Sequence, residues 1–141
     1  MGFDLWLADA CSTADVCYDD FVLTIAAGGY PCLPGTAPGS SRTFDETDLL
    51  ALYVYGRLVA FGVGSLRAGE YAGQVHHALR TNANAKSVAI VLTSYGGKRV
   101  LVEFESHAPA RSEKIAFDIS AIRKFLNRRI ESYREEQTQI H

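Results

Sequence analysis

The sequence predicts an α+β fold, with a helical N-terminal part followed by a β-hairpin and a long C-terminal amphipathic helix. Apolar residues recur at helical spacing between residues 45 and 80. In contrast, residues 87–106 contain two runs with strand-like alternation of side chains, one on each side of a Gly-Gly pair. This pattern is typical of a hairpin. The polar segment 80–86 lies between these patterns, so we expect one unit over residues 1–80 and a second over residues 87–141.

Length and composition are those of a globular protein. The chain has 141 residues, of which 48% are hydrophobic and 21% charged, and no run approaches the ~20 apolar residues of a membrane-spanning helix. The N-terminus has an acid and no basic region, unlike a secretory signal. Three cysteines without C-x-x-C spacing indicate reduced thiols in a cytoplasmic protein, with metal or redox sensing as the alternative.

The helical part is expected to contain four helices. The first two cover residues 4–11 and 18–27. A central helix runs from Asp45, which can accept hydrogen bonds as its N-cap, to about residue 61. Gly62 supplies the left-handed residue that ends this helix, and Ser65 is expected to cap the next one.

The central helix also carries a recognisable pattern. An arginine, an aromatic residue and an Asp-Leu pair open it, and a Leu-x-x-x-Gly sequence closes it; the residues are Arg42, Phe44, Asp48, Leu49, Leu58 and Gly62. Upstream, a Gly-Tyr-Pro sequence precedes a loop rich in glycine, serine and proline. Over about residues 5–80 this pattern resembles the MerR-type winged helix-turn-helix transcriptional regulators.

The resemblance implies a winged helix-turn-helix N-terminal part, double-stranded DNA as the ligand and a homodimer. Helix 18–27 then corresponds to the recognition helix, which lies in the major groove, and the loop up to residue 41 corresponds to the wing. The residues expected to contact DNA are Tyr18, Thr24, Ser40, Ser41, Arg42, Arg57, Lys98 and Arg99. The residues expected to form the dimer interface lie on the C-terminal helix and are Ile122, Leu126, Ile130 and Tyr133.

The charge distribution favours an alternative. Residues 1–50 hold eight acids and one base, and the remaining thirteen bases lie in residues 51–141. Phosphate neutralisation supplies most of the affinity of DNA-binding proteins, so an acidic DNA-binding half is unusual. The alternative is a protein-interaction module on a degenerate helix-turn-helix fold, which binds a basic protein partner through its acidic half. In this interpretation no duplex DNA is bound.

In the second unit, residues 87–95 and 98–106 form the two strands of the hairpin, and residues 115–117 form a short third strand. The first strand is apolar on both faces, so another element must cover it. The final helix covers residues 120–136 and carries an apolar stripe with a basic run on its other side. That helix is either packed on the hairpin or used for dimerisation.

Catalytic and metal-binding patterns are weak. The sequence has none of the common zinc-protease, deaminase or serine-hydrolase motifs. His76 and His77 are adjacent on a helix, so at most one can point towards a shared metal. The Gly-rich loop lacks the ending of a phosphate-binding loop. We therefore expect no enzyme activity, no catalytic residues, no metal and no cofactor.

Overall fold

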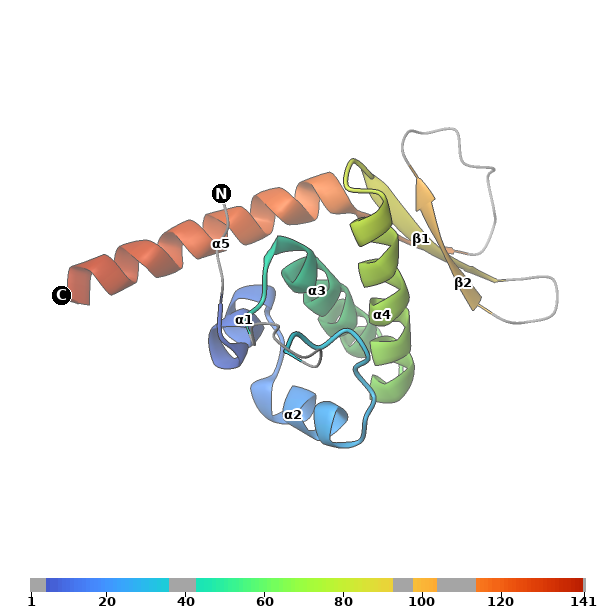
Figure 1. Cartoon of the computed structure of the whole chain (residues 1–141), viewed down its shortest axis with the longest axis horizontal. Helices are drawn as coiled ribbons and strands as arrows, with labels where there is room; N and C mark the ends of the chain where they lie inside the picture. The colour runs from blue at the N-terminus through green and yellow to red at the C-terminus, as the bar shows by residue number, and fades with distance from the viewer. Residues whose placement is uncertain (1–4, 36–42, 93–97, 104–113, 141) are drawn as a thin grey trace.

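The computed structural model describes residues 5–35, 43–92, 98–103 and 114–140, and these form an α+β fold (Figure 1). Five helices and one three-stranded sheet lie within these ranges, which confirms the expected class. In chain order the elements are α1 (Leu7–Ala14), α2 (Tyr18–Ala26), α3 (Glu46–Ala60), α4 (Ser65–Thr81), β1 (Ser87–Leu92), β2 (Lys98–Glu103), β3 (Lys114–Asp118) and α5 (Ile119–Ile140).

Helix α3 is the centre of the fold. Its start is a capping box, because the Asp45 carboxylate accepts a hydrogen bond from the N–H of Asp48 at 2.9 Å and the Asp48 carboxylate accepts one from the N–H of Asp45 at 2.9 Å. Gly62 follows the helix with φ 96°, the left-handed conformation that the sequence predicts. Leucines on different sides of the helix are buried, namely Leu49, Leu50, Leu52 and Leu58. Helix α3 therefore packs against neighbours on more than one side.

Helix α4 packs along α3 and is joined to its start by charged groups. The Asp48 carboxylate lies 2.7 Å from Nε2 of His76, and the Arg80 guanidinium donates to Asp45 at 2.8 Å and to Asp48 at 3.2 Å. The start of α4 differs from the prediction. Gly64 is the N-cap and its extended backbone leads directly into Ser65, which is the first helical residue and makes no capping bond.

The sheet lies beyond α4 and has the antiparallel order β2-β1-β3 (Figure 1). Val88 of the central strand pairs with Val102 on one side and with Phe117 on the other. Buried residues 88–90 point alternately to both faces of β1, as the continuous apolar run predicts. The third strand expected at residues 115–117 is confirmed, since β3 covers these residues. The Gly-Gly turn lies outside the described residues.

Helix α5 runs back from the sheet across the N-terminal helices (Figure 1). The Arg129 guanidinium donates to the backbone carbonyl of Ser12 at 2.9 Å, and the Tyr133 hydroxyl donates to the Asp9 carboxylate at 3.0 Å. Buried residues of α5 join the same hydrophobic core as those of α1, α3 and α4. The two expected units therefore share one core.

Candidate functional site

Helices α1 and α2 are connected by a tight turn. Asp15 adopts the left-handed conformation with φ 62°, and the N–H of Val16 donates to the carbonyl of Cys11 at 2.8 Å. Aspartate tolerates this conformation better than most residues because its short polar side chain bonds locally. Helix α1 packs against α3, and α2 contacts α1 and α4.

The inner side of α2 is fixed by aromatic packing. The ring of Phe21 lies edge-on to Tyr30, with centroids 4.7 Å apart, and 5.3 Å from the ring of Tyr55. Thr24 is buried, and its hydroxyl lies 2.8 Å from the Tyr55 hydroxyl. The expectation that Thr24 contacts DNA is corrected here, because its side chain is directed into the core and its hydroxyl already has partners.

The outer side of α2 is apolar and acidic. We call it the α2 surface; it consists of Tyr18, Asp19, Asp20, Val22 and Leu23 together with Leu66 at the start of α4. The exposed fractions are 69% for Leu23 and 58% for Leu66. A shallow hollow of about 260 Å³ between the two helices is lined by these leucines, Asp20 and Ser65, among others. The α2 surface is thus a mixed apolar and anionic patch.

No base accompanies these acids on α1, the turn or α2, because the first lysine or arginine in the sequence is Arg42. Within the described part of the chain, the Asp19 and Asp20 carboxylates have no hydrogen-bond or ion-pair partner. The negative charge of the α2 surface is therefore not neutralised by the chain itself in those ranges.

The other residues expected to contact DNA are distributed over several elements. Ser40, Ser41 and Arg42 lie outside the described residues. Arg57 is half-buried in the last turn of α3, 5.7 Å above the ring of Phe61. Lys98 and Arg99 belong to β2, where they pair with Leu92 and Val91 of β1. Helix α4 lies between α2 and this strand, so Tyr18 is the only described member of the set on the α2 surface (Figure 1).

The residues expected at a dimer interface are covered within one chain. Ile122, Leu126 and Ile130 are buried against the common core, and Tyr133 bonds to Asp9. The expectation that this stripe is free for a second chain is corrected, because α1, α3 and the sheet already bury it. A homodimer would have to use another surface.

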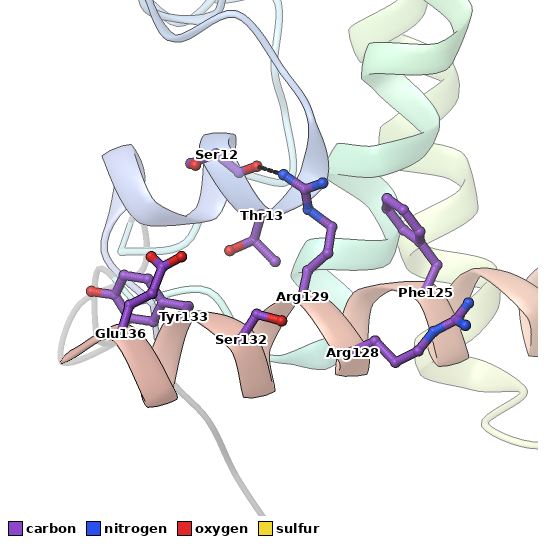
Figure 2. Close-up of a pocket in the computed structure, with 8 residues that line it drawn as sticks. All are labelled: Ser12, Thr13, Phe125, Arg128, Arg129, Ser132, Tyr133 and Glu136. Atoms are coloured by element: carbon purple, nitrogen blue, oxygen red, sulfur yellow. Dashed lines mark hydrogen bonds between the residues drawn. The ribbon is translucent and has the colours of Figure 1, made fainter. Parts of the chain in front are cut away.

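A second polar site lies between α1 and α5 (Figure 2). This groove has a volume of about 500 Å³ and is lined by Ser12, Thr13, Phe125, Arg128, Arg129, Ser132, Tyr133 and Glu136. Figure 2 shows the Arg129 side chain reaching towards α1, and Arg128 lying along α5 beside Phe125. The Arg129 guanidinium is 5.4 Å from the centre of the Phe125 ring. We call this feature the α1–α5 groove.

The sequence predicted Tyr18 as a contact residue, but it predicted neither the exposed apolar residues of the α2 surface nor the α1–α5 groove. One signal was present for the α2 surface: Phe21, Val22 and Leu23 are consecutive, and three consecutive helical residues cannot all face one core. No comparable signal existed for the α1–α5 groove, since its residues are separated by more than 100 positions.

The surroundings of Cys11, Cys32 and His76 suit structural roles. No group of three or more histidine, cysteine or acidic side chains suited to a metal occurs in the described ranges. Burial raises the pKa of Cys11 to about 12 and that of Cys32 to about 11, so neither thiol is a ready nucleophile at neutral pH. His76 is paired with Asp48, which is buried in the α3–α4 contact.

Comparison with models of protein families and with curated proteins found no match to this chain. Across the described residues, no helix combines the length and the apolar character needed to cross a membrane. The candidate functional sites are the α2 surface and the α1–α5 groove.

Proposed function

We propose that the protein is a cytoplasmic regulatory protein that binds a protein partner through the α2 surface. The observation that carries this proposal is the composition of that surface, in which exposed Tyr18, Val22 and Leu23 lie beside two carboxylates that have no partner among the described residues. A helix that lies in the major groove faces phosphates on both sides, and neighbouring carboxylates there are repelled.

The chemistry of the surface defines the partner. Exposed apolar side chains bury area on association, which is the main favourable contribution to protein–protein binding. The Asp19 and Asp20 carboxylates favour a partner that carries lysine or arginine next to its apolar residues. The partner that fits best is an amphipathic segment with one apolar face and basic flanks, for which the hollow beside Leu23 and Leu66 provides a seat.

The test uses a synthetic amphipathic peptide with leucine and lysine at helical spacing, and a scrambled peptide of equal charge. We expect the amphipathic peptide to bind the purified chain and the scrambled one to bind at least about tenfold more weakly. Leu23→Ser should abolish most of the binding because Leu23 is the most exposed apolar residue of the surface. The double change Asp19→Asn and Asp20→Asn should weaken binding at ~50 mM salt more than at ~200 mM.

Leu66→Ser is a second test of the surface and Val63→Ser is its matched control, each measured as a single variant. Leu66 lines the hollow, whereas Val63 lies in the connection before α4 and does not. Loss of binding in both variants, or equal binding of both peptides, would argue against the α2 surface as the docking site.

A second candidate function is a DNA-binding transcriptional regulator, as the MerR-type resemblance implies. One observation accords with it: Leu5 and Phe44 form a β-bridge, so the residues just before α3 are held beside the chain just before α1. In this reading, the contacts come from Ser40, Ser41 and Arg42, with Tyr18 on α2 and bases such as Arg57, Lys98 and Arg99.

Titration with a mixed-sequence DNA duplex separates the two functions. Under the DNA-binding reading, Arg42→Ala should weaken binding to all sequences and reduce the slope of the salt dependence by about one. The Asp19→Asn and Asp20→Asn variant should tighten binding to the duplex. Under the protein-binding proposal, the duplex is not retained at ~50 mM salt and the same variant loses peptide affinity.

A further inference from the structure

We propose that the α1–α5 groove binds a small, elongated molecule with a carboxylate or phosphate at one end and an ammonium or hydroxyl group at the other. This inference does not depend on the proposed function, because it concerns a different surface. The groove has a volume of about 500 Å³, within the usual range of small-molecule sites. Its walls come from two helices that are tied together by the Arg129–Ser12 and Tyr133–Asp9 hydrogen bonds, so the site is already formed.

The first observation is a pair of guanidinium groups without carboxylate partners. Elsewhere on the described surface, Arg80 pairs with Asp45 and Asp48, and Arg123 pairs with Glu46 at 3.0 Å. In the same ranges, Arg128 has no hydrogen bond or ion pair, and Arg129 uses its guanidinium for one backbone carbonyl and the Phe125 ring. An arginine has five N–H donors, so most donors of this pair remain available to an anion.

The second observation is the Thr13 side chain. This residue is only 4% exposed, yet its hydroxyl has no hydrogen-bond partner among the described residues. Figure 2 shows the hydroxyl directed into the space between α1 and α5. The hydroxyl is not among the buried side-chain atoms that lack a partner in the described residues, so it is open to the groove and to water. A bound molecule with a polar group near the middle of the groove can bond to it.

The third observation is that the charge changes sign along the groove. Arg128 and Arg129 lie at one end, beside the apolar ring of Phe125, and Glu136 lies at the other end, beside Tyr133 (Figure 2). Glu136 follows Arg129 by seven positions of α-helix, which corresponds to a rise of about 10 Å. The anionic group of the ligand therefore lies near the arginines, and a hydrogen-bond donor lies near the Glu136 carboxylate.

The experiment titrates the full chain with probes that differ only at their ends: 8-aminooctanoate, octanoate, octylamine and inorganic phosphate. Binding is followed by the amide NMR signals of Ser12 and Ser132. We expect 8-aminooctanoate to bind most tightly, octanoate and phosphate more weakly, and octylamine weakest. Arg128→Gln should weaken 8-aminooctanoate and octanoate about tenfold. Glu136→Gln should remove the advantage of 8-aminooctanoate over octanoate and leave octanoate unchanged.

Lys124→Gln is the matched control, because it removes one positive charge from an exposed position of α5 that does not line the groove. It should leave all affinities within about twofold, and Arg128→Lys should restore part of the affinity for octanoate. The inference is overturned if Lys124→Gln weakens binding as much as Arg128→Gln. It is also overturned if octylamine binds as well as octanoate, or if no probe shifts the two signals at ~10 mM.

Discussion

Helices α2 and α3 begin in the same way in the sequence but not in the structure. Each carries two acids in its first turn, Asp19 and Asp20 in α2 and Glu46 and Asp48 in α3. In α3 every one of these carboxylates has a partner, either a backbone N–H, a histidine or an arginine. In α2 the N-cap makes no side-chain hydrogen bond, and neither carboxylate has a partner within the described part of the chain.

This difference shows that an acid at a helix start can serve two purposes. A carboxylate there interacts favourably with the helix dipole and the unpaired N–H groups in either case. In α3 the carboxylates also connect the helix to α4 and α5, so they are part of the scaffold. In α2 the negative charge stays on the surface, where a partner can use it. If this distinction is correct, substitutions in the scaffold should lower the stability more than substitutions on the free surface of α2.

The largest effect is expected at the contact that holds α2 against α4. A methyl group at position 69 would overlap the carbonyl oxygen of Gly29, which follows α2. Gly69→Ala should therefore lower the free energy of unfolding by about 2 kcal/mol or more, despite the better helix propensity of alanine. Chemical denaturation measures this change.

The control is Gly56→Ala in α3, where the added methyl group meets the end of the Val16 side chain instead of backbone. A side chain can shift more easily than the backbone, so we expect a smaller loss than for Gly69→Ala. If both variants lose the same stability, the close approach of α4 to the end of α2 is not what fixes α2.

A smaller effect is expected from the capping carboxylate of α3. Asp48→Ala removes the acceptor for the N–H of Asp45 and the partner of His76 and Arg80, and should cost about 2 kcal/mol at most. Asp20→Ala in α2 removes a carboxylate without a described partner and should change stability by less than about 0.5 kcal/mol. If Asp48→Ala and Asp20→Ala lowered the stability equally in thermal or chemical unfolding, the two helix starts would not differ in this way.

The smallest effect is expected from pH. Burial alone would raise the pKa of Asp45, but hydrogen bonds from the Asp48 N–H and the Arg80 guanidinium outweigh it and lower the pKa. A group whose folded pKa is lowered stabilises the protein above its unfolded pKa, near 3.8, and this stabilisation disappears as the pH falls through the folded pKa. Asp45→Asn should therefore be less stable than the parent at pH 6 and approach it near pH 2.

Asp19→Asn provides the comparison in the same measurement. Asp19 has no partner among the described residues, so Asp19→Asn should change stability at pH 6 by less than about 0.5 kcal/mol. A loss at pH 6 as large as that of Asp45→Asn would mean that α2 has a charged partner after all.

Local signals in the sequence predicted the limits of the central helix and the third strand. The cap at Asp45, the left-handed Gly62 and the strand at residues 115–117 each follow from one or two neighbouring residues. Ser65 was predicted as a cap because serine is a good acceptor, but glycine at position 64 occupies that place. Such boundary errors are expected, since helix ends fray and their limits are defined only to within one or two residues.

Long-range packing could not be predicted in the same way. The stripe at Ile122, Leu126 and Ile130 indicates that something covers it, but periodicity does not say whether the cover is the same chain or another. The structure places α1 and α3 there. For the same reason, the α1–α5 groove and the burial of Thr24 depend on contacts between distant segments, which no local pattern contains.

The contact between α1 and α5 also has a consequence for the order of events during synthesis. Ser12 and Arg129 are 117 positions apart, and Asp9 and Tyr133 are 124 apart. At about 5–20 residues per second, α1 is made roughly 6 to 25 s before the helix that covers it. During that interval the apolar side of α1, including Ala10 and Ala14, lacks part of its final cover. The nascent chain is therefore most exposed to aggregation before α5 is synthesised.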